Sequence, residues 1–436
     1  MRKILSIILV FVLAVLSLSA CKSDNNNDSN NITLYVLEDQ WGGMGNSAIY
    51  YFYNKKADEK DKIELVTFES VQAMKDKISS ELMAGKGPDI ILDETLMMTG
   101  LSVQKLIEAD SFYDLSELDL DYSSYRQNTT SENNKQLFIS SFYSPKFWVC
   151  CEEDIKDIVS GDVLSYDELI ALSESTDKRL FSDSVFNDSF ILNYIVDNVD
   201  FNHKSFDFGS EEFKTTIEQL KELYIRENGK QGDNYIFDVY AHGSPYDTYT
   251  VFARIENDGK TPAIVGTPSL NSKFSAYAIG EISINKNINK SKLESAKKFL
   301  QFAMSEKYQN EITGADIEQY NTNFSYTTGN MFPMNTKVFE KLMSNADSFA
   351  YNTSGEYEPD GSDTPRTDEP QAKISEKSLK LLHDKLDSIQ YYEMNTYTIG
   401  YNVVIQDIIA DYYDGKISVD SLVSQLKSKT QIYLEE

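Results

Sequence analysis

The sequence predicts an α/β protein of two lobes that follows a short secretory leader. The chain has 436 residues, more than one hydrophobic core usually organises, and 41% of them are hydrophobic. Strand and helix patterns alternate between residues 32 and 107. That order is typical of a parallel sheet with helices on its faces. Ligands of such sheets bind outside the carboxyl ends of the strands.

The leader has the features of a bacterial secretory signal. Arg2 and Lys3 precede an apolar and small-residue run at 4–18, shorter than the ~20 residues of a membrane-spanning helix. The sequence Leu-Ser-Ala-Cys at 18–21 resembles the lipobox of bacterial lipoproteins. The resemblance implies that residues 1–20 are a signal peptide, cleaved before Cys21. It also implies a lipid anchor, with acyl chains such as palmitate on Cys21, which would hold the protein on the outer face of the cell membrane. The alternative is an ordinary secretory peptide with an incidental cysteine.

The folded body is expected to begin after a polar tether at 21–31. Strands are predicted at 32–37, 62–68 and 88–92, and helices at 47–60, 71–84 and 96–107. Strands at 135–142 and 147–151 flank Ser144-Pro145, where a crossover between the two expected domains is predicted. Further crossovers are expected within 269–284 and 321–331, and helices at 211–223, 373–389 and 403–413. Adjacent Cys150 and Cys151 are expected to pack as small hydrophobic side chains, since neighbouring cysteines rarely form a disulfide.

Several short segments resemble extracellular solute-binding proteins of family 1, the ABC-importer class that includes maltodextrin-binding and other sugar-binding proteins. They are Met83–Ile91 (MAGKGPDII), Phe112–Ser116, Leu164–Leu169, Phe206–Lys214, Ile282–Lys286, Ala296–Phe302, Phe332–Asn335 and Gly415–Asp420. The resemblance implies a periplasmic-binding-protein-like fold with a hinge and an interlobe cleft. It assigns 32–143 and 278–330 to an N-terminal lobe, and 144–277 and 331–436 to a C-terminal lobe. Two departures leave the ligand class open: 252–260 lacks the family's usual motif, and 351–371 is an acidic insertion, expected to be a mobile loop.

Composition and motifs argue against several other functions. The net charge of −28 disfavours nucleic acid and anionic lipid as partners. His203, His242 and His383 lack the spacing of a zinc site, and no Gly-x-Ser-x-Gly nucleophile motif occurs. The acidic segment 358–363 does not follow a calcium-loop pattern. We therefore expect a binding protein without a cofactor or bound metal rather than an enzyme.

The candidate ligand residues are either aromatic or acidic, because a sugar stacks its C–H faces on rings and donates its hydroxyls to carboxylates. Each lies in a predicted loop, crossover or strand end near the cleft. The candidates are Trp41, Asp93, Glu94, Trp148, Tyr246, Asp247, Tyr277 and Tyr401. Trp41 lies in the Gly-rich loop after the first strand, Tyr246 and Asp247 in an expected loop at 243–249, and Tyr401 ahead of the last long helices. Core packing is the alternative for the aromatic residues, above all for Trp148.

The expected function is capture of a small solute, first of all an oligosaccharide, for delivery to the permease subunits of an ABC transporter. A peptide or another solute on the same fold is the second hypothesis. A secreted glycoside hydrolase is the third. It would need two carboxyl groups ~5–9.5 Å apart across one cleft, and the sequence singles out no such pair.

Overall fold

The computed structural model describes residues 31–37, 47–126, 131–132, 135–183, 189–201, 203–232, 234–239, 241, 243–313, 331–344 and 374–435. Cys21, Trp41, all but the last residue of the third crossover at 321–331 and the insertion at 351–371 lie outside these ranges. Among the described helices, none has the length and apolar character needed to cross a bilayer.

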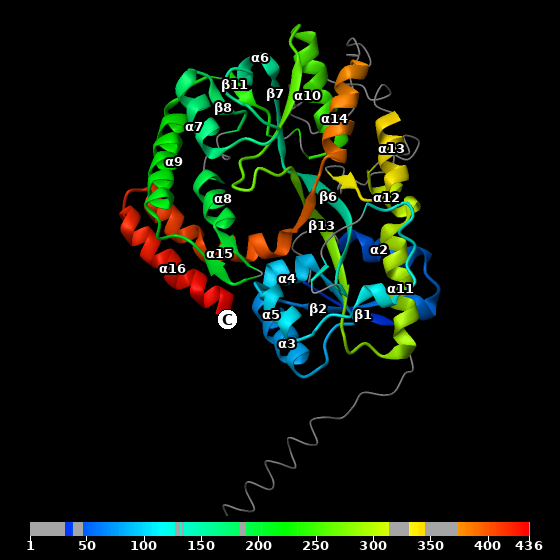
Figure 1. Ribbon diagram of the computed structural model, residues 1–436. Coiled ribbons are helices and arrows are strands. Elements are labelled where there is room, and N and C mark those ends of the chain that lie inside the picture. The colour runs from blue at the N-terminus through cyan, green and yellow to red at the C-terminus, as the bar shows by residue number, and fades with distance from the viewer. Residues whose placement is uncertain are drawn as a thin grey trace, which may run out of the picture.

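The largest described sheet has seven strands and occupies the lower half of Figure 1, extending upward along two long strands. Its order is β14-β6-β13-β3-β1-β2, with β15 also paired to β13. The strands are β1 (Ile32–Leu37), β2 (Ile63–Phe68), β3 (Ile90–Leu92), β6 (Ile139–Pro145), β13 (Ser275–Ile284), β14 (Phe332–Pro333) and β15 (Tyr391–Met394). β1 is parallel to β2 and β3, which confirms the predicted parallel β-α-β-α-β core.

Helices cover both faces of this sheet, and successive side chains of a strand point to opposite faces. Ile90 and Leu92 of β3 point into one core with α2 (Ser47–Lys56), α11 (Lys290–Met304) and α12 (Glu306–Thr313). Ile91 points into the other, with α3 (Val71–Met83), α4 (Asp93–Thr99) and α5 (Val103–Glu108). This period of two, buried on both faces, is what a central parallel strand requires. Other short elements of this half are Glu59–Asp61, Leu115–Glu117, β4 (Ser131–Glu132) and β5 (Lys135–Gln136).

The Gly-Lys-Gly-Pro-Asp segment, which carried the family resemblance, forms the turn between α3 and β3. Gly85 and Gly87 have positive φ angles of 68° and 110°, which residues with a Cβ rarely adopt. Asp89 Oδ2 accepts hydrogen bonds from the Thr33 amide and hydroxyl, both at 2.8 Å, and pairs with Lys292 at 2.9 Å. The motif therefore has a structural role: it fixes β3 beside β1.

A two-stranded ribbon separates the sheet's core from a second one. β7 (Phe147–Cys151) pairs antiparallel with β12 (Pro262–Gly266). Phe147 and Val149 point into the first core, whereas Trp148 and Cys150 point into the second. The buried strand predicted at 147–151 is confirmed, and both cysteines are free.

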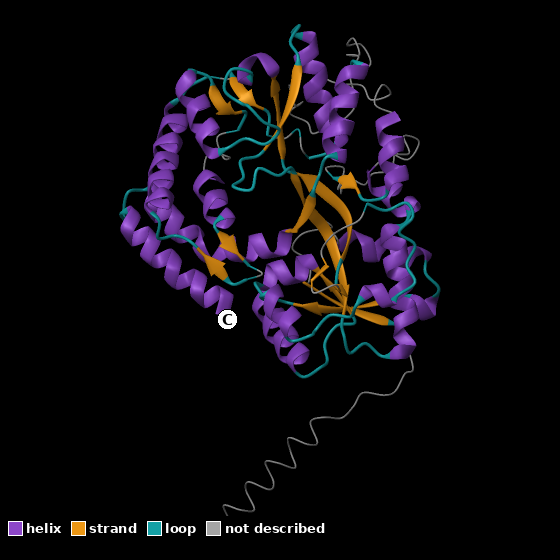
Figure 2. Cartoon of the chain, viewed as in Figure 1, coloured by secondary structure: helices purple, strands orange, loops and turns teal. Residues whose placement is uncertain are grey.

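The second core lies among helices in the upper left half of Figure 1. Its elements are α6 (Glu152–Ile155), α7 (Tyr166–Ser175), β8 (Arg179–Phe181), α8 (Ser189–Asp197), β9 (Val199–Asp200), β10 (Ser205–Phe206), α9 (Glu211–Gly229), β11 (Tyr235–Phe237), α15 (Asn395–Tyr413) and α16 (Val419–Glu435). α10 (Pro245–Asn257), α13 (Thr336–Ser344) and α14 (Glu376–Asp387) pack instead on the first core. Figure 2 shows how helices dominate this half, while the long strands concentrate in the other.

Three of the predicted elements were wrong in detail, and one strand was missed. The helix expected at 96–107 is two helices, because Gly100 adopts a left-handed φ of 59° and ends the first. The helix expected from residue 47 ends at Lys56. The strand at 135–142 is shifted to Ile139–Pro145, so it runs into the crossover. β15 was not predicted, since its four residues are too short to show a period.

Candidate ligand-binding site

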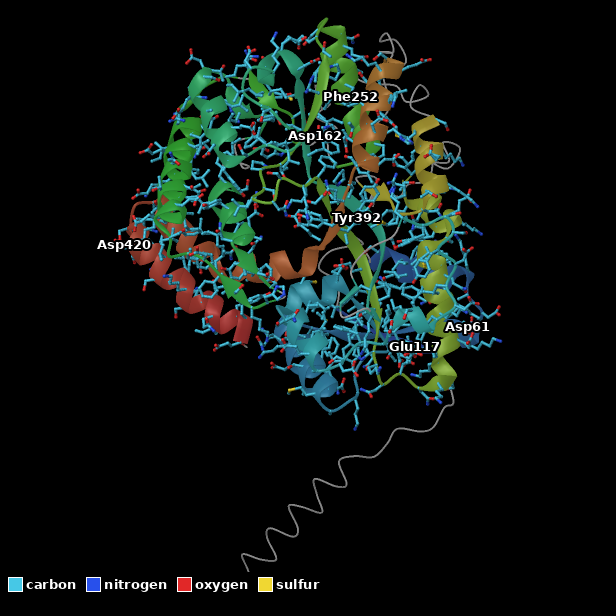
Figure 3. All side chains as sticks on the ribbon, in the orientation of Figure 1. Asp61, Glu117, Asp162, Phe252, Tyr392 and Asp420 are labelled. Atoms are coloured by element: carbon cyan, nitrogen blue, oxygen red, sulfur yellow. The ribbon has the colours of Figure 1, made fainter. Side chains whose placement is uncertain are left out.

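The two halves of the chain meet along the first residues of β13. Here β6 pairs with β13 on one edge, with Tyr277 opposite Ser144, while β15 pairs on the other edge, with Tyr277 opposite Glu393. The chain then enters the second core twice, from β6 through Lys146 into β7 and from β15 into α15. Figure 3 labels Tyr392 of β15 at this position, between the upper and lower halves. The junction therefore brings side chains from distant segments together.

Lys146 is the centre of a polar cluster at the junction. Its Nζ lies 3.1 and 3.2 Å from the two carboxylate oxygens of Glu393, and 4.9 Å from the centre of the Tyr277 ring. Ser275 Oγ donates a further hydrogen bond to Glu393 at 3.0 Å. Burial disfavours the charged amine, but Tyr277, Glu393 and Asp197 outweigh it and raise the pKa of Lys146. Lys146 is therefore an ammonium ion at neutral pH.

Asp197, the last residue of α8, brings a second carboxylate to the same cluster. Its Oδ2 accepts hydrogen bonds from the Tyr166 hydroxyl at 3.0 Å and from the Leu270 amide at 3.2 Å. Burial raises the pKa of Asp197 above its usual value even though Lys146 acts in the opposite direction. The environment thus holds this carboxyl group in place but stabilises its charge incompletely.

Tyrosines and amides complete the cluster, which we call the junction cluster: Lys146, Tyr166, Asp197, Asn271, Ser275, Tyr277, Tyr391 and Glu393. Asn271 donates to the Tyr391 hydroxyl at 2.6 Å. Burial is the main cause of the raised pKa of Tyr277, so its phenol stays protonated. The junction cluster therefore offers rings, hydroxyls, an ammonium and carboxylates within one region. Polyhydroxylated solutes are recognised by this combination.

The predicted site residue that belongs to the junction cluster is Tyr277. Asp93, the first residue of α4, lies beside Gly280, which is three residues beyond Tyr277 on β13 and so about 10 Å from it in an extended strand. Its carboxylate is 5% exposed and accepts hydrogen bonds from the amides of Glu94 at 2.6 Å and Gly280 at 3.1 Å. β15 pairs with residues 275–278 of β13, and β3 pairs with residues 282–284. Gly280 lies between these two parts, so its amide is left for the Asp93 carboxylate. Glu94 is half-buried, and its charge adds to burial in raising the pKa of Tyr50.

Trp148 and Tyr401 lie in the second core. Trp148 is 5% exposed and packs on Phe181 and Phe237, with ring centroids 4.6 and 5.0 Å away. Tyr401 is fully buried inside α15, where its hydroxyl meets Thr430. The expectation that Tyr401 precedes the last helices was wrong, because α15 begins at Asn395. In this conformation neither ring is open to a ligand.

Asp247 lies in the first turn of a helix, where it exchanges hydrogen bonds with the N-cap residue. The loop expected at 243–249 was wrong in part, because α10 begins at Pro245, with Ser244 as its N-cap. The Ser244 hydroxyl donates to Asp247 at 2.7 Å and accepts from the Asp247 amide at 3.1 Å. Burial raises the pKa of Asp247. Tyr246 lies on the same helix, but its side chain is outside the described set. The neighbouring Tyr249 is fully buried.

Sequence reasoning missed Lys146, Tyr166, Asp197 and Glu393. Lys146 follows the predicted crossover Ser144-Pro145, and that position was an available signal. Asp197 ends an ordinary amphipathic helix and Glu393 lies in an unrecognised strand, so neither had a local signal. No group of three or more His, Cys, Asp or Glu side chains suited to a metal ion occurs in the described ranges.

The architecture defined by this sheet, junction and second core is that of two-lobed, periplasmic-type solute-binding proteins, which confirms the predicted fold class. Solved structures share it over nearly the whole chain. An extracellular solute-binding protein of family 1 from Alicyclobacillus acidocaldarius matches with a TM-score of 0.52 and 12% identity, over 93% of this chain and 98% of its own.

Two further structures match in the same way. The sugar-binding protein MalE from Xanthomonas citri has a TM-score of 0.51 and 11% identity, over 93% and 97% of the two chains. A cyclic alpha-maltosyl-1,6-maltose binding protein from Arthrobacter globiformis matches with a TM-score of 0.50 and 11% identity, over 93% of this chain and 99% of its own. No family model matches the sequence, and no curated protein matches it. The similarity thus lies in the fold.

Proposed function

We propose that this protein is an extracellular solute-binding protein that captures a carbohydrate and delivers it to the permease of an ABC transporter. The observation that carries the proposal is the junction cluster, which places rings and charged groups where the chain passes between its two halves. The fold shared with sugar-binding proteins over 93% of the chain supports it.

Binding alone accounts for this function, without covalent chemistry. A pyranose can lay its apolar face on a tyrosine ring, while its hydroxyls donate to Glu393 or Asp197 and accept from Lys146. A solute that contacts residues from both halves favours the arrangement in which they approach each other. A peptide or another solute on the same fold is the second hypothesis, and a direct binding test separates the two.

Binding is tested by calorimetry with a panel of oligosaccharides, short peptides and single sugars on the purified protein. We expect saturable binding of an oligosaccharide, with the solute recovered unchanged. Binding of peptides alone would overturn the carbohydrate assignment, and release of shortened sugars would favour a hydrolase. Lys146→Met should weaken sugar binding at least tenfold, because it removes a charged hydrogen-bond donor. The matched control Lys427→Met changes an amine outside the junction cluster.

Trp41, in the Gly-rich segment that follows β1 in the sequence, is a second candidate platform. Trp41→Ala should weaken sugar binding by roughly 30-fold, equivalent to ~2 kcal/mol at a buried aromatic contact. Its emission can be followed alone after Trp148→Phe, and ligand should shift it. An unshifted emission with unchanged affinity would exclude Trp41 from the site.

The anchor is a separate proposal: Cys21 is acylated and holds the protein on the outer face of the membrane. It is supported by the Leu-Ser-Ala-Cys sequence and the polar tether behind it. Cys21→Ala should abolish labelling by a palmitate analogue and release the protein from the membrane fraction, without changing sugar affinity. Unchanged membrane association of the variant would contradict an acyl anchor.

A further inference from the structure

We propose that the solute of the junction cluster carries a protonated amine, and that Asp197 is the residue that selects for it. This inference rests on the proposed function and narrows it from carbohydrates to amino sugars. It follows from the charge balance and hydrogen bonding of the cluster.

The junction cluster has one cation for two carboxylates. Both oxygens of Glu393 lie within 3.2 Å of the Lys146 amine, so the charges of this pair balance each other. The Ser275 hydroxyl adds a third contact to Glu393. Asp197 shares the field of the same amine without a direct ion pair to it. One negative charge is therefore left over in a half-buried place, where uncompensated charge is costly.

The carboxylate of Asp197 is held by one oxygen only. Oδ2 takes both hydrogen bonds, from Tyr166 and from the Leu270 amide. Oδ1 accepts none from any residue that the structure describes, and the side chain is half-buried rather than sealed. The two donors fix the orientation of the carboxylate, so Oδ1 is a preorganised acceptor for a group from outside the chain.

Its position at the end of α8 makes a cation the better partner. The carbonyl end of a helix carries partial negative charge, which disfavours a carboxylate and favours a positive group. The charged or titratable groups facing Asp197 are Lys146 from the β6–β7 junction, Glu393 from β15, Tyr166 from α7 and Tyr277 from β13. Lys146 is the one cation among them and is already paired. A neutral hydroxyl could bond Oδ1, but only an ammonium would also balance the charge.

The test compares glucosamine oligomers with their N-acetylated counterparts of equal length, since the pair differs in the amine. Calorimetry at a pH where the amine is protonated should show at least tenfold tighter binding of the amine form to the unaltered protein, as expected for a charge-assisted bond. Asp197→Asn should abolish the preference while keeping the thermal transition. Asp420→Asn, which removes an exposed charge 77% accessible on α16, should keep the preference.

The outcomes separate the two proposals. Equal or tighter binding of the N-acetylated or another neutral oligomer by the unaltered protein would overturn the amine inference and leave sugar binding intact. A preference that persists in Asp197→Asn would overturn the role of Asp197. Absence of any sugar binding would overturn the proposed function, and the amine inference with it. The comparison of ligands on the unaltered protein needs no variant to fold.

Discussion

Glu227 and Asp197 are carboxylates of the same helical half, yet they differ in their hydrogen-bond donors and in the cation that balances their charge. Glu227, on α9, is 1% exposed in its side chain. Its Oε2 accepts from the Leu180 amide at 2.7 Å, and its Oε1 from the Ser173 hydroxyl and from Lys230 at 2.8 Å. Asp197 has two donors on one oxygen, and its nearest cation is bound to Glu393. Both groups are polar and largely enclosed, but only one has its charge neutralised within the chain.

The difference separates a structural network from a binding one. Lys230 also donates to the carbonyls of Ser173, Thr176 and Lys178, so the Glu227 network connects α7, β8 and α9 without an open position. A buried polar network helps to specify one structure only when each of its polar groups has a hydrogen-bond partner. In the junction cluster, Oδ1 of Asp197 has no donor among the described residues, and it lies where three segments of the chain meet. In our proposal, this unfilled acceptor and the unbalanced charge are together the feature that makes Asp197 available to a ligand.

The largest effect is expected from Glu227→Ala. The change leaves the Lys230 amine and the Leu180 amide without a carboxylate in an enclosed place, which typically costs ~3–5 kcal/mol of unfolding free energy. Urea unfolding measures the loss, and sugar affinity of the fraction that remains folded should be unchanged. Glu174→Ala is the matched control: this carboxylate is 58% exposed and pairs with Arg226, so its loss should cost under ~1 kcal/mol. Equal costs for the two variants would contradict a closed structural network at Glu227.

Trp148→Ala should be similarly destabilising for a different reason. The ring fills the second core between Phe181 and Phe237, and truncation of a buried aromatic costs about 3–5 kcal/mol through the cavity it leaves. Trp148→Phe keeps most of the volume and should cost less than half as much. Ligand affinity measured below the unfolding transition should be the same in both variants. A selective loss of affinity in Trp148→Ala, with stability kept, would place the ring in the ligand site instead.

A smaller effect is expected in the pH dependence of stability at Asp197. Because the folded pKa is raised, the folded state binds a proton more tightly than the unfolded chain does, whose aspartates titrate near ~3.9. The contribution of Asp197 to stability is therefore greatest at low pH and is lost as pH rises from ~4 through the folded pKa. Unfolding free energies of the unaltered protein minus those of Asp197→Asn should fall over that interval. A difference that stays constant or grows with pH would contradict an incompletely stabilised charge.

The same titration should affect binding in the opposite direction. A protonated amine needs the ionised form of Asp197, so its affinity should increase as pH rises through the folded pKa of Asp197 while the amine stays charged. Affinity for a neutral oligomer should vary much less. An affinity for the amine form that declines over this interval would contradict the pairing of Asp197 with the amine.

How far the sequence could predict these features depends on the range of the interactions involved. The strands 32–37 and 147–151 follow from the local pattern of apolar residues, and they were predicted. Asp197 and Glu393 are 196 residues apart and meet only because β13, β15 and α8 come together. No local pattern encodes that meeting, so the candidate site was predicted at Tyr277 but not around it. Trp148 and Tyr401 show the converse: aromatic residues that were candidates for ligand contact pack in a core instead.

The smallest effect is expected from a third carboxylate, Glu108, which is exposed and lies between the two halves. Glu108 ends α5 beside the sheet, and its Oε1 lies 2.6 Å from the amine of Lys204 in the β9–β10 turn of the helical half. The hydrogen bond from Lys204 is the main cause of the lowered pKa of Glu108, and burial acts against it. The pair therefore stabilises the fold above the unfolded pKa of ~4.3, and this contribution is lost as pH falls through the folded pKa. Its side chains are 36% and 45% exposed, so water and salt screen the attraction.

Lys204→Ala should accordingly cost only ~0.2–1 kcal/mol, and less at high salt. The affinity for sugar should change by no more than about fivefold, since that energy is the most the pair could add to an approach of the two halves. Urea unfolding at low and high salt, with calorimetry of the same variant, measures both. Lys105→Ala, on the same helix as Glu108, controls for the general loss of a positive charge. A loss of unfolding free energy above ~2 kcal/mol that salt leaves unchanged would show that the Glu108–Lys204 pair is as enclosed as the Glu227–Lys230 pair. Solvent exposure would then no longer distinguish weakly from strongly stabilising carboxylates.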